Sequence, residues 1–499
     1  MSPSTTTSPA QTRAFARFAD GLPVGDVIPF WHDGTYHLFI LTPPASTLHY
    51  PERLLTTWRH ITSTDLIDWT ELPPAIAPGD PAEADGGGIW TGSVIEADGL
   101  FHIFYTAHAS DSLQAICHAT SPDGITWEKD PANPISRPDP SRFESNDWRD
   151  PFVFWNAEEQ RYWMLITARS LLANAASRGV VAFATSTDLT AWSEFEIFYD
   201  TFLTHAPECP EVFRLGDSWV LGYSRFTDRR GTVYRVSESL SGPWRSFGAE
   251  GPDAANWYAA KGLSDATGRR IAFGWVPDHD PELRDPANPW LWAGDLALPR
   301  ELRLDERGRI TMHMPVEVEH AIGSATALTE AGGTDNWSSI AGRGIQGNAI
   351  GTVATRVFES AEASTASVFS ATFDDVDDSQ LVGVVVHTNE MVDHGVGIYY
   401  YPRIHSIRAV DMKAPAGKVT AEYESMFGQY APVAEHDLTG PLEGPVEFRV
   451  VIRGDVVEAF VGEACCLTFR SKGAESTHAA VVVVDGDARV SDISWRRFG

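Results

Sequence analysis

Three carboxylates stand just ahead of regularly spaced strands, and their residue types suit acid–base chemistry on a sugar. Asp26 lies 10 residues before one predicted strand, Asp150 lies 12 before another, and Glu208 lies 11 before a third. Two carboxyl groups that face each other across a sugar are the minimum for cleaving a glycosidic bond, one as nucleophile or base and the other as acid. A third can hold sugar hydroxyls. Carboxylates also serve as turn and cap residues, so this alternative stays open from spacing alone.

The neighbours of these carboxylates assign them different roles. Arg149 beside Asp150 is expected to keep that carboxylate ionised. Glu208 lies in the sequence Pro207-Glu208-Cys209-Pro210, a less polar setting in which desolvation raises the pKa, as a general acid requires.

The strands that position these residues form a repeat. Similar apolar or aromatic segments begin at Tyr36, Phe101, Tyr162, Trp219 and Arg270, which are 65, 61, 57 and 51 residues apart. Recurrence of short strands at such a period is typical of a β-propeller with one blade per repeat. Equivalent places in the blades of a closed ring converge on its axis, so the repeat predicts a carboxylate cluster there.

A second repeat, offset from the first, has a Ser/Thr-x-Asp turn followed by a tryptophan. Its aspartates are Asp65, Asp123 and Asp188, and its tryptophans are Trp69, Trp127, Trp192 and Trp244. Aspartate and serine side chains accept hydrogen bonds from the local backbone in such turns. We therefore assign these aspartates to turns and the tryptophans to packing between blades.

The length of 499 residues indicates more than one domain. We predict an all-β chain: a disordered tail (1–20), a five-bladed propeller (21–315), a linker (316–325) and a β-sandwich (326–499). The last part has many short alternating strands and no convincing long helix, which is typical of a sandwich. The sandwich is also a candidate surface for a homo-oligomer.

Composition disfavours several kinds of partner. The formal net charge is −30, which disfavours binding to nucleic acid or to anionic membranes but not to neutral sugars. The four cysteines show neither zinc-binding spacing nor a disulfide framework, and we expect no metal and no cofactor. No apolar run is long enough to span a membrane. The N-terminus has no signal-peptide core, which predicts a cytoplasmic protein unless an export signal has been removed.

Several segments together resemble the β-fructofuranosidases, invertases, levanases and fructan transferases of glycoside hydrolase family 32. Trp148-Arg149-Asp150-Pro151 is similar to the family's Arg-Asp-Pro motif, and Glu208-Cys209-Pro210 to its Glu-Cys-Pro motif. Trp90-Thr91-Gly92-Ser93 resembles its Trp-Ser-Gly-Ser segment. Further similar segments are Trp58–Trp69, Trp257-Tyr258, Gly268–Trp275 and Trp292–Leu302. The resemblance covers about residues 24 to 315 and implies a propeller with a C-terminal sandwich.

The resemblance implies a role for each carboxylate. Asp26 would attack the anomeric carbon and form a covalent fructosyl-enzyme, and Glu208 would protonate the leaving oxygen. Asp150 would bind hydroxyls of the furanose ring. Configuration would be retained, and the two reacting carboxyls would lie roughly 5–5.5 Å apart.

Other residues of these motifs are candidates for substrate binding. They are Arg149, Trp90, Ser93, Trp58, Trp257 and Tyr258. Aromatic rings at the entries to blades two and five would stack on sugar faces or simply pack, and both alternatives stay open.

The opening segment departs from the family pattern. The family usually begins Trp-Met-Asn-Asp-Pro-Asn-Gly and has a glutamine downstream, whereas here Gly25 precedes Asp26 and Leu41 stands near the place of the glutamine. The opening looks more like the levan fructotransferase-type branch, which cleaves β-2,6-fructan and releases a difructose dianhydride. We therefore favour levan over sucrose, and leave open whether water or a hydroxyl of the chain takes the fructosyl group.

Two other interpretations fit the propeller. One is a glycosidase for arabinofuranose or xylose, against which the Glu-Cys-Pro triplet argues. The other is a non-catalytic carbohydrate-binding propeller, suggested by the altered opening and opposed by the presence of all three carboxylates.

Overall fold

The structure is a computed structural model, and it shows a chain of two compact units. It describes residues 18, 20–45, 47, 52–172, 177–227, 230–246, 251–278, 292–361, 366–412, 432–463, 465–471 and 476–498. The predicted disordered tail, 1–20, lies almost wholly outside the described residues. One unit comprises 1–245 and 257–302, and the other comprises 246–256 and 303–499.

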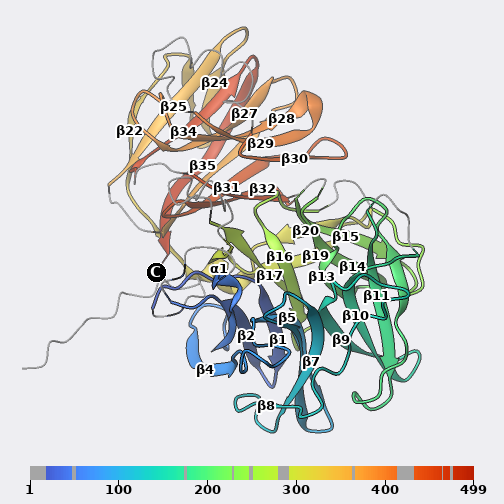
Figure 1. The fold of residues 1–499 in the computed structure, drawn as a ribbon. Coiled ribbons are helices and arrows are strands. Elements are labelled where there is room, and N and C mark those ends of the chain that lie inside the picture. The colour runs from blue at the N-terminus through green and yellow to red at the C-terminus, as the bar shows by residue number, and fades with distance from the viewer. Residues whose placement is uncertain are drawn as a thin grey trace, which may run out of the picture. The chain divides into compact units, whose positions relative to one another are not determined.

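The first unit is the predicted five-bladed β-propeller, coloured blue to yellow in Figure 1. The first blade is β1 (Val27–His32), β2 (Thr35–Thr42), β3 (Thr57–Ser63) and β4 (Thr70–Ile76), with a short 3-10 helix at Glu52–Leu54. The second is β5 (Ile89–Ala97), β6 (Leu100–His108), β7 (Gln114–Ser121) and β8 (Glu128–Lys129). The third is β9 (Arg149–Asn156), β10 (Arg161–Arg169), β11 (Gly179–Ser186) and β12 (Glu196–Asp200).

The last two blades complete the ring. The fourth is β13 (Glu208–Leu215), β14 (Ser218–Arg225) and β15 (Gly231–Ser237). The fifth is β16 (Tyr258–Ser264), β17 (Arg270–Pro277), β18 (Gly294–Leu296) and β19 (Arg300–Leu304), and β20 (Ile310–His313) follows β19 in that sheet. Each innermost strand contacts that of the next blade, and β16 contacts β1. Backbone hydrogen bonds of 2.9 and 2.8 Å between Val24 and Gly294 also join the first segment to the fifth blade.

The second repeat has the predicted turn and packing roles. In each turn the aspartate Oδ1 accepts hydrogen bonds from backbone amides two and three residues ahead, at 2.8–2.9 Å. Each tryptophan packs against an aromatic side chain of the preceding blade of the propeller. The pairs are Trp69–Phe273, Trp127–Phe39, Trp192–Phe104 and Trp244–Phe198. Blades are thus held together by aromatic contacts between their faces, which explains why their strands are apolar over most of their length.

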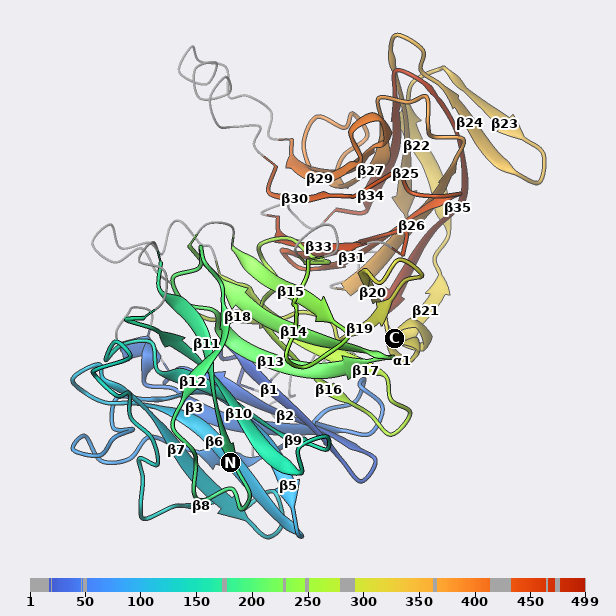
Figure 2. The same cartoon turned by 90° about the vertical axis from the view of Figure 1, so that its right-hand side faces the viewer.

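The second unit is the predicted β-sandwich, coloured mostly orange and red in Figure 2. One sheet contains β21 (Ile322–Ala325), β23 (Trp337–Ile340), β24 (Gly344–Asn348), β26 (Ala366–Asp374), β31 (Val446–Arg453), β32 (Val456–Val461), β33 (Cys465–Arg470) and β35 (Asp487–Phe498). The other contains β22 (Leu328–Gly333), β25 (Val353–Ser360), β27 (Leu381–Thr388), β28 (Val396–Tyr401), β29 (Ser406–Asp411), β30 (Ala434–Asp437) and β34 (His478–Val484). Phe369 and Phe448 of one sheet share a buried core with Val384 and Val481 of the other.

The segment predicted as a linker, 316–325, is ordered as a short helix α1 (Val316–Ala321) followed by β21, which pairs with β35. A second 3-10 helix covers Pro402–Ile404. Residues 246–256 lie within the predicted propeller sequence but belong to the second unit. There Asp253 accepts hydrogen bonds from the Thr468 amide (2.8 Å) and hydroxyl (2.6 Å). An oligomer through the sandwich stays a prediction.

Candidate functional site

The candidate site is built at the beginnings of the inner strands, where four blades carry a local irregularity. In the pairing ladders, Trp90, Arg149, Glu208 and Tyr258 face equivalent residues of their second strands, and each ladder shifts register directly afterwards. In the first blade, Leu41 bonds to both Gly25 and Asp26. Bulges of this kind turn a side chain away from the regular pleat. The strands therefore direct their first side chains toward one another at the axis.

The ladders correct the register that the sequence predicts. Glu208 faces the second strand of its blade, but in the third blade that place belongs to Arg149, and Asp150 comes one residue later. In the first blade Gly25 and Asp26 share the place opposite Leu41. The residues directly after Arg149, Glu208 and Tyr258 all have positive φ: 60° at Asp150, 50° at Cys209 and 49° at Ala259. Non-glycine residues adopt this conformation only when the surrounding structure holds them there.

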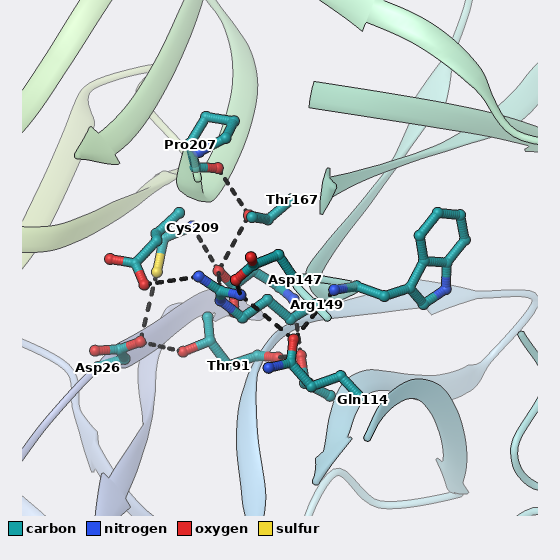
Figure 3. A network of polar contacts seen from close by, with 12 residues as sticks. Asp26, Thr91, Gln114, Asp147, Arg149, Thr167, Pro207 and Cys209 are labelled. Atoms are coloured by element: carbon teal, nitrogen blue, oxygen red, sulfur yellow. Dashed lines mark hydrogen bonds and ion pairs between the residues drawn. The ribbon is translucent and has the colours of Figure 1, made fainter. Parts of the chain in front are cut away.

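Asp26 is partly exposed and is held by two donors from other blades. Its Oδ2 accepts a short hydrogen bond from the Thr91 hydroxyl, and the thiol of Cys209 lies 3.5 Å from the same atom (Figure 3). Burial, and to a smaller extent the charge of Asp150, raises the pKa of Asp26 to about 6, against the lowering effect of the Thr91 hydrogen bond. One carboxylate oxygen is thereby fixed in position by blades two and four.

Asp150 is buried, and its Oδ2 is also fixed. That atom accepts a hydrogen bond of 2.8 Å from the Cys209 amide and lies 3.2 Å from the Thr167 hydroxyl, which itself lies 2.7 Å from the Pro207 carbonyl oxygen. The Asp150 amide donates to the Thr106 hydroxyl at 2.7 Å. Among the described residues nothing hydrogen-bonds to Oδ1, so this oxygen is left for another partner.

Glu208 is bound through both carboxylate oxygens. Arg149 Nη2 lies 2.9 Å from Oε1, and the Tyr258 hydroxyl donates a short hydrogen bond to Oε2. Burial raises the pKa of Glu208 to about 7, although the Arg149 cation and the Tyr258 hydrogen bond lower it. Its side chain keeps 22% of its surface exposed, so a ligand can reach it. A carboxyl group with this pKa can hold a proton near neutral pH and release it during a reaction.

Arg149 is the centre of the polar network in Figure 3. Its guanidinium contacts Glu208, makes a short hydrogen bond to Asp147, lies 3.3 Å from Gln114 Oε1 and has Nε 3.6 Å from Asp150 Oδ2. Although burial lowers the pKa of Arg149, the three carboxylates raise it above its ordinary value. This cation thus links Glu208 to Asp150 across two blades.

The other candidate binding residues lie in different environments. Trp90 is half-buried: its ring stacks on His108 with centroids 4.2 Å apart, and its Nε1 donates to the Leu54 carbonyl oxygen. Tyr258 contacts Glu208 directly. Ser93 is buried and its hydroxyl accepts the Val153 amide at 2.9 Å, joining blades two and three.

Trp58 and Trp257 are fully buried at 0% and 1% exposure, so neither presents a ring face to a sugar in this structure. Trp58 Nε1 donates to the Trp90 carbonyl oxygen at 2.9 Å. This hydrogen bond holds the backbone of Trp90 in place. A direct contact between Trp58 and substrate stays a prediction.

The sequence reasoning missed several residues that complete the site. Thr91, Gln114, Asp147 and Thr167 hold the carboxylates or Arg149, and Cys209 bonds to Asp26 and Asp150. Thr91 and Asp147 lie within two residues of Trp90 and Arg149, so scanning the motif neighbours for hydroxyls and carboxylates would have found them. Gln114 and Thr167 carry no such local signal, because only the propeller brings them to the axis.

The comparison with known families decides the assignment. The pattern described as “Glycosyl hydrolases family 32 N-terminal domain” matches residues 28–315, more than half of the chain. The chain belongs to glycosyl hydrolase family 32. The pattern described as “Glycosyl hydrolases family 32 C terminal” matches 337–496. The predicted family is thereby confirmed.

Curated relatives include two proteins of Escherichia coli. The “Raffinose invertase” is 30% identical over 311 residues, and the “Sucrose-6-phosphate hydrolase” is 29% identical over 316 residues. Each match covers 58% of this chain and 61% of the relative, so the chain matches about three fifths of the relatives' length.

Solved structures share the fold along nearly the whole chain. The sucrose-6-phosphate hydrolase of Lactobacillus gasseri has a TM-score of 0.72 at 18% identity, covering 99% of this chain and 94% of the other. The fructan 1-exohydrolase IIa of Cichorium intybus has a TM-score of 0.69 at 18% identity, covering 94% and 95%. At these identities the likeness shows the fold alone.

Within the described ranges, no group of three or more His, Cys, Asp and Glu side chains is arranged to hold a metal ion. In the same part of the chain, no helix combines the length and apolar character needed to cross a bilayer. The cellular location stays a prediction.

Proposed function

We propose that the protein is a retaining, fructan-active glycosidase or fructosyltransferase that acts on β-fructofuranosyl linkages, with levan as the favoured substrate. The observation that carries this proposal is the pair of carboxyl groups at the beginnings of the inner strands of blades one and four, Asp26 and Glu208, each with a raised pKa. Their environments differ as the two roles of a retaining glycosidase require.

In the proposed mechanism Asp26 is the nucleophile. Thr91 and Cys209 hold Oδ2, which leaves Oδ1 to attack the anomeric carbon of the fructosyl unit. As the bond to the leaving oxygen breaks, Glu208 transfers its proton to that oxygen, and a covalent ester to Asp26 forms. Glu208 then takes a proton from water or from a sugar hydroxyl, which attacks the same carbon and releases Asp26.

Asp150 and Arg149 position the sugar in this proposal. Asp150 Oδ1 accepts ring hydroxyls, while its Oδ2 is held by Cys209 and Thr167. The positive charge of Arg149 lowers the pKa of Glu208. It thereby stabilises the ionised Glu208 that is needed as a base in the second step. Two structural neighbours are complexes with 1-kestose and fructosylnystose, which supports an oligosaccharide substrate here.

The preference for levan rests on the opening segment. Leu41, near the place of the family's usual glutamine, is only 2% exposed and belongs to an apolar core. A side chain at Gly25 would meet the ring of Trp292, since an added Cβ would lie 2.2 Å from it. An indole therefore occupies the place of the polar residue that usually precedes the nucleophile, and fewer polar groups remain for binding sucrose in the usual way.

Product analysis tests this proposal. Levan, inulin and sucrose are incubated in parallel with the wild type and with Asp26→Asn, and the products are separated by chromatography. A non-reducing difructose dianhydride from levan would indicate a transferase, and free fructose a hydrolase. Faster turnover of sucrose than of levan would overturn the levan preference. No product from any of the three would overturn the proposed function and direct attention to arabinan or to binding without turnover.

A further inference from the structure

A buried lysine lies on the propeller axis close to the candidate nucleophile. Lys261 follows the bulge at the beginning of β16 and is 1% exposed. Its Nζ donates a hydrogen bond of 2.9 Å to the carbonyl oxygen of Gly92, which is on β5. Blades five and two are not neighbours in the ring, so this hydrogen bond crosses the axis.

The ammonium group lies near two chain segments that hold or carry the carboxylates. Gly92 follows Thr91, whose hydroxyl binds Asp26. The ring of Phe152, two residues after Asp150, has its centroid 5.4 Å from Nζ. Lys261 therefore joins segments of blades two, three and five that carry or hold the reacting groups.

A buried cation is costly unless charges near it compensate for the lost hydration. Among the described residues Lys261 forms no ion pair, and Gly92 is its one hydrogen-bond partner. Asp26 likewise forms no ion pair within the described part of the chain. The positive charge of Lys261 lowers the pKa of Asp26, opposing burial and the charge of Asp150.

We infer that Lys261 is a positioning residue: its hydrogen bond to Gly92 across the axis holds the segment whose Thr91 binds Asp26 and brings a positive charge toward that carboxylate. Arg149 serves Glu208 and Asp150, whereas Lys261 acts on Asp26 from the axis. This inference rests on the proposed function in one respect: it takes Asp26 as the nucleophile.

The test compares Lys261→Met with the wild type in the pH dependence of kcat/KM on the best fructan substrate. Without the positive charge, the acidic limb should move up by about one pH unit, giving roughly a tenfold loss at pH 5 and little change at pH 8. Lys261→Arg, which keeps the charge, should restore the limb. Lys129→Met is the matched control, because Lys129 pairs with Asp85 (2.6 Å) instead of the site, and it should leave the limb in place.

A second readout needs no activity. The folded-state pKa of Asp26 exceeds its unfolded value, so Asp26 makes the melting temperature fall as pH rises through about 6. In Lys261→Met this fall should continue to higher pH, and it should shrink when Asp26→Asn is added, which leaves the part due to Glu208 near pH 7. An unchanged acidic limb together with an unchanged pH dependence of melting would overturn the inference. Absent fructan turnover with the predicted melting behaviour would instead overturn only the proposed function.

Discussion

The propeller holds carboxylates in two kinds of place, and the pKa values of two residues in each are shifted in opposite directions. In the outer turns, backbone amides of Thr126 and Ile125 donate to Asp123 and lower its pKa to about 2, and Asp188 is shifted the same way. At the axis, burial raises the pKa of Asp26 to about 6 and that of Glu208 to about 7. Residue type alone therefore does not decide the chemistry. A solvent-exposed carboxylate that accepts hydrogen bonds from two backbone amides stays ionised and stabilises a turn. A desolvated carboxyl group with few donors has a raised pKa, which suits it to acid–base chemistry.

The largest expected effect comes from neutralising an axial carboxylate. Asp26→Asn removes the nucleophile and Glu208→Gln removes the acid, so each should lower kcat by about 10³-fold or more on the fructan that the wild type turns over fastest. Asp188→Asn, a turn variant, is the control and should keep nearly full activity. Equal losses in all three variants would show that the two kinds of place do not differ in function.

The pH profile of the wild type sharpens the comparison. Asp26 must be ionised and Glu208 protonated, so kcat/KM should fall below pH about 6 and above pH about 7. The decline on each side should approach tenfold per pH unit, and the two apparent values belong to the coupled pair. A flat profile between pH 5 and 8 would contradict the assignment of these two groups.

Tyr258 tests the contribution of a single donor at the axis. Its hydroxyl lowers the pKa of Glu208, so Tyr258→Phe should move the alkaline limb of the profile upward. The loss of positioning should also lower kcat by about tenfold. The control is Tyr199→Phe, whose hydroxyl lies 3.3 Å from Arg235 Nε in the same propeller and does not contact the carboxylates. An alkaline limb that stays in place would show that Tyr258 does not set this pKa.

Much of the difference between the turn aspartates and the axial carboxylates could be predicted from the sequence, because it depends on local patterns. The Ser/Thr-x-Asp turns are encoded within a few residues, and the aromatic strand repeat fixes the number of blades. The three axial carboxylates could be found because each precedes a repeat. Their one-residue offset could not be found, since it depends on where each ladder shifts register, as between Glu208 and Glu211. Gln114 and Lys261 also escaped prediction, because their partners come from other blades.

The two kinds of place should also differ in their effect on stability, with opposite signs. The pKa of Asp123 is lower in the folded protein than in the unfolded chain, so its charge stabilises the fold above pH about 4, and this contribution is lost as pH falls toward 2. The pKa of Asp26 is raised, so its ionisation destabilises the fold as pH rises through about 6.

Asp26→Asn should therefore raise the melting temperature at pH 8 while abolishing activity, whereas Asp123→Ala should lower it slightly and keep activity. Below pH about 4 Asp26 is protonated, and the gain from Asp26→Asn should disappear. Calorimetry of both variants at pH 4 and 8 measures this, and a fall in melting temperature for Asp26→Asn at pH 8 would show that its hydrogen bonds outweigh its desolvation.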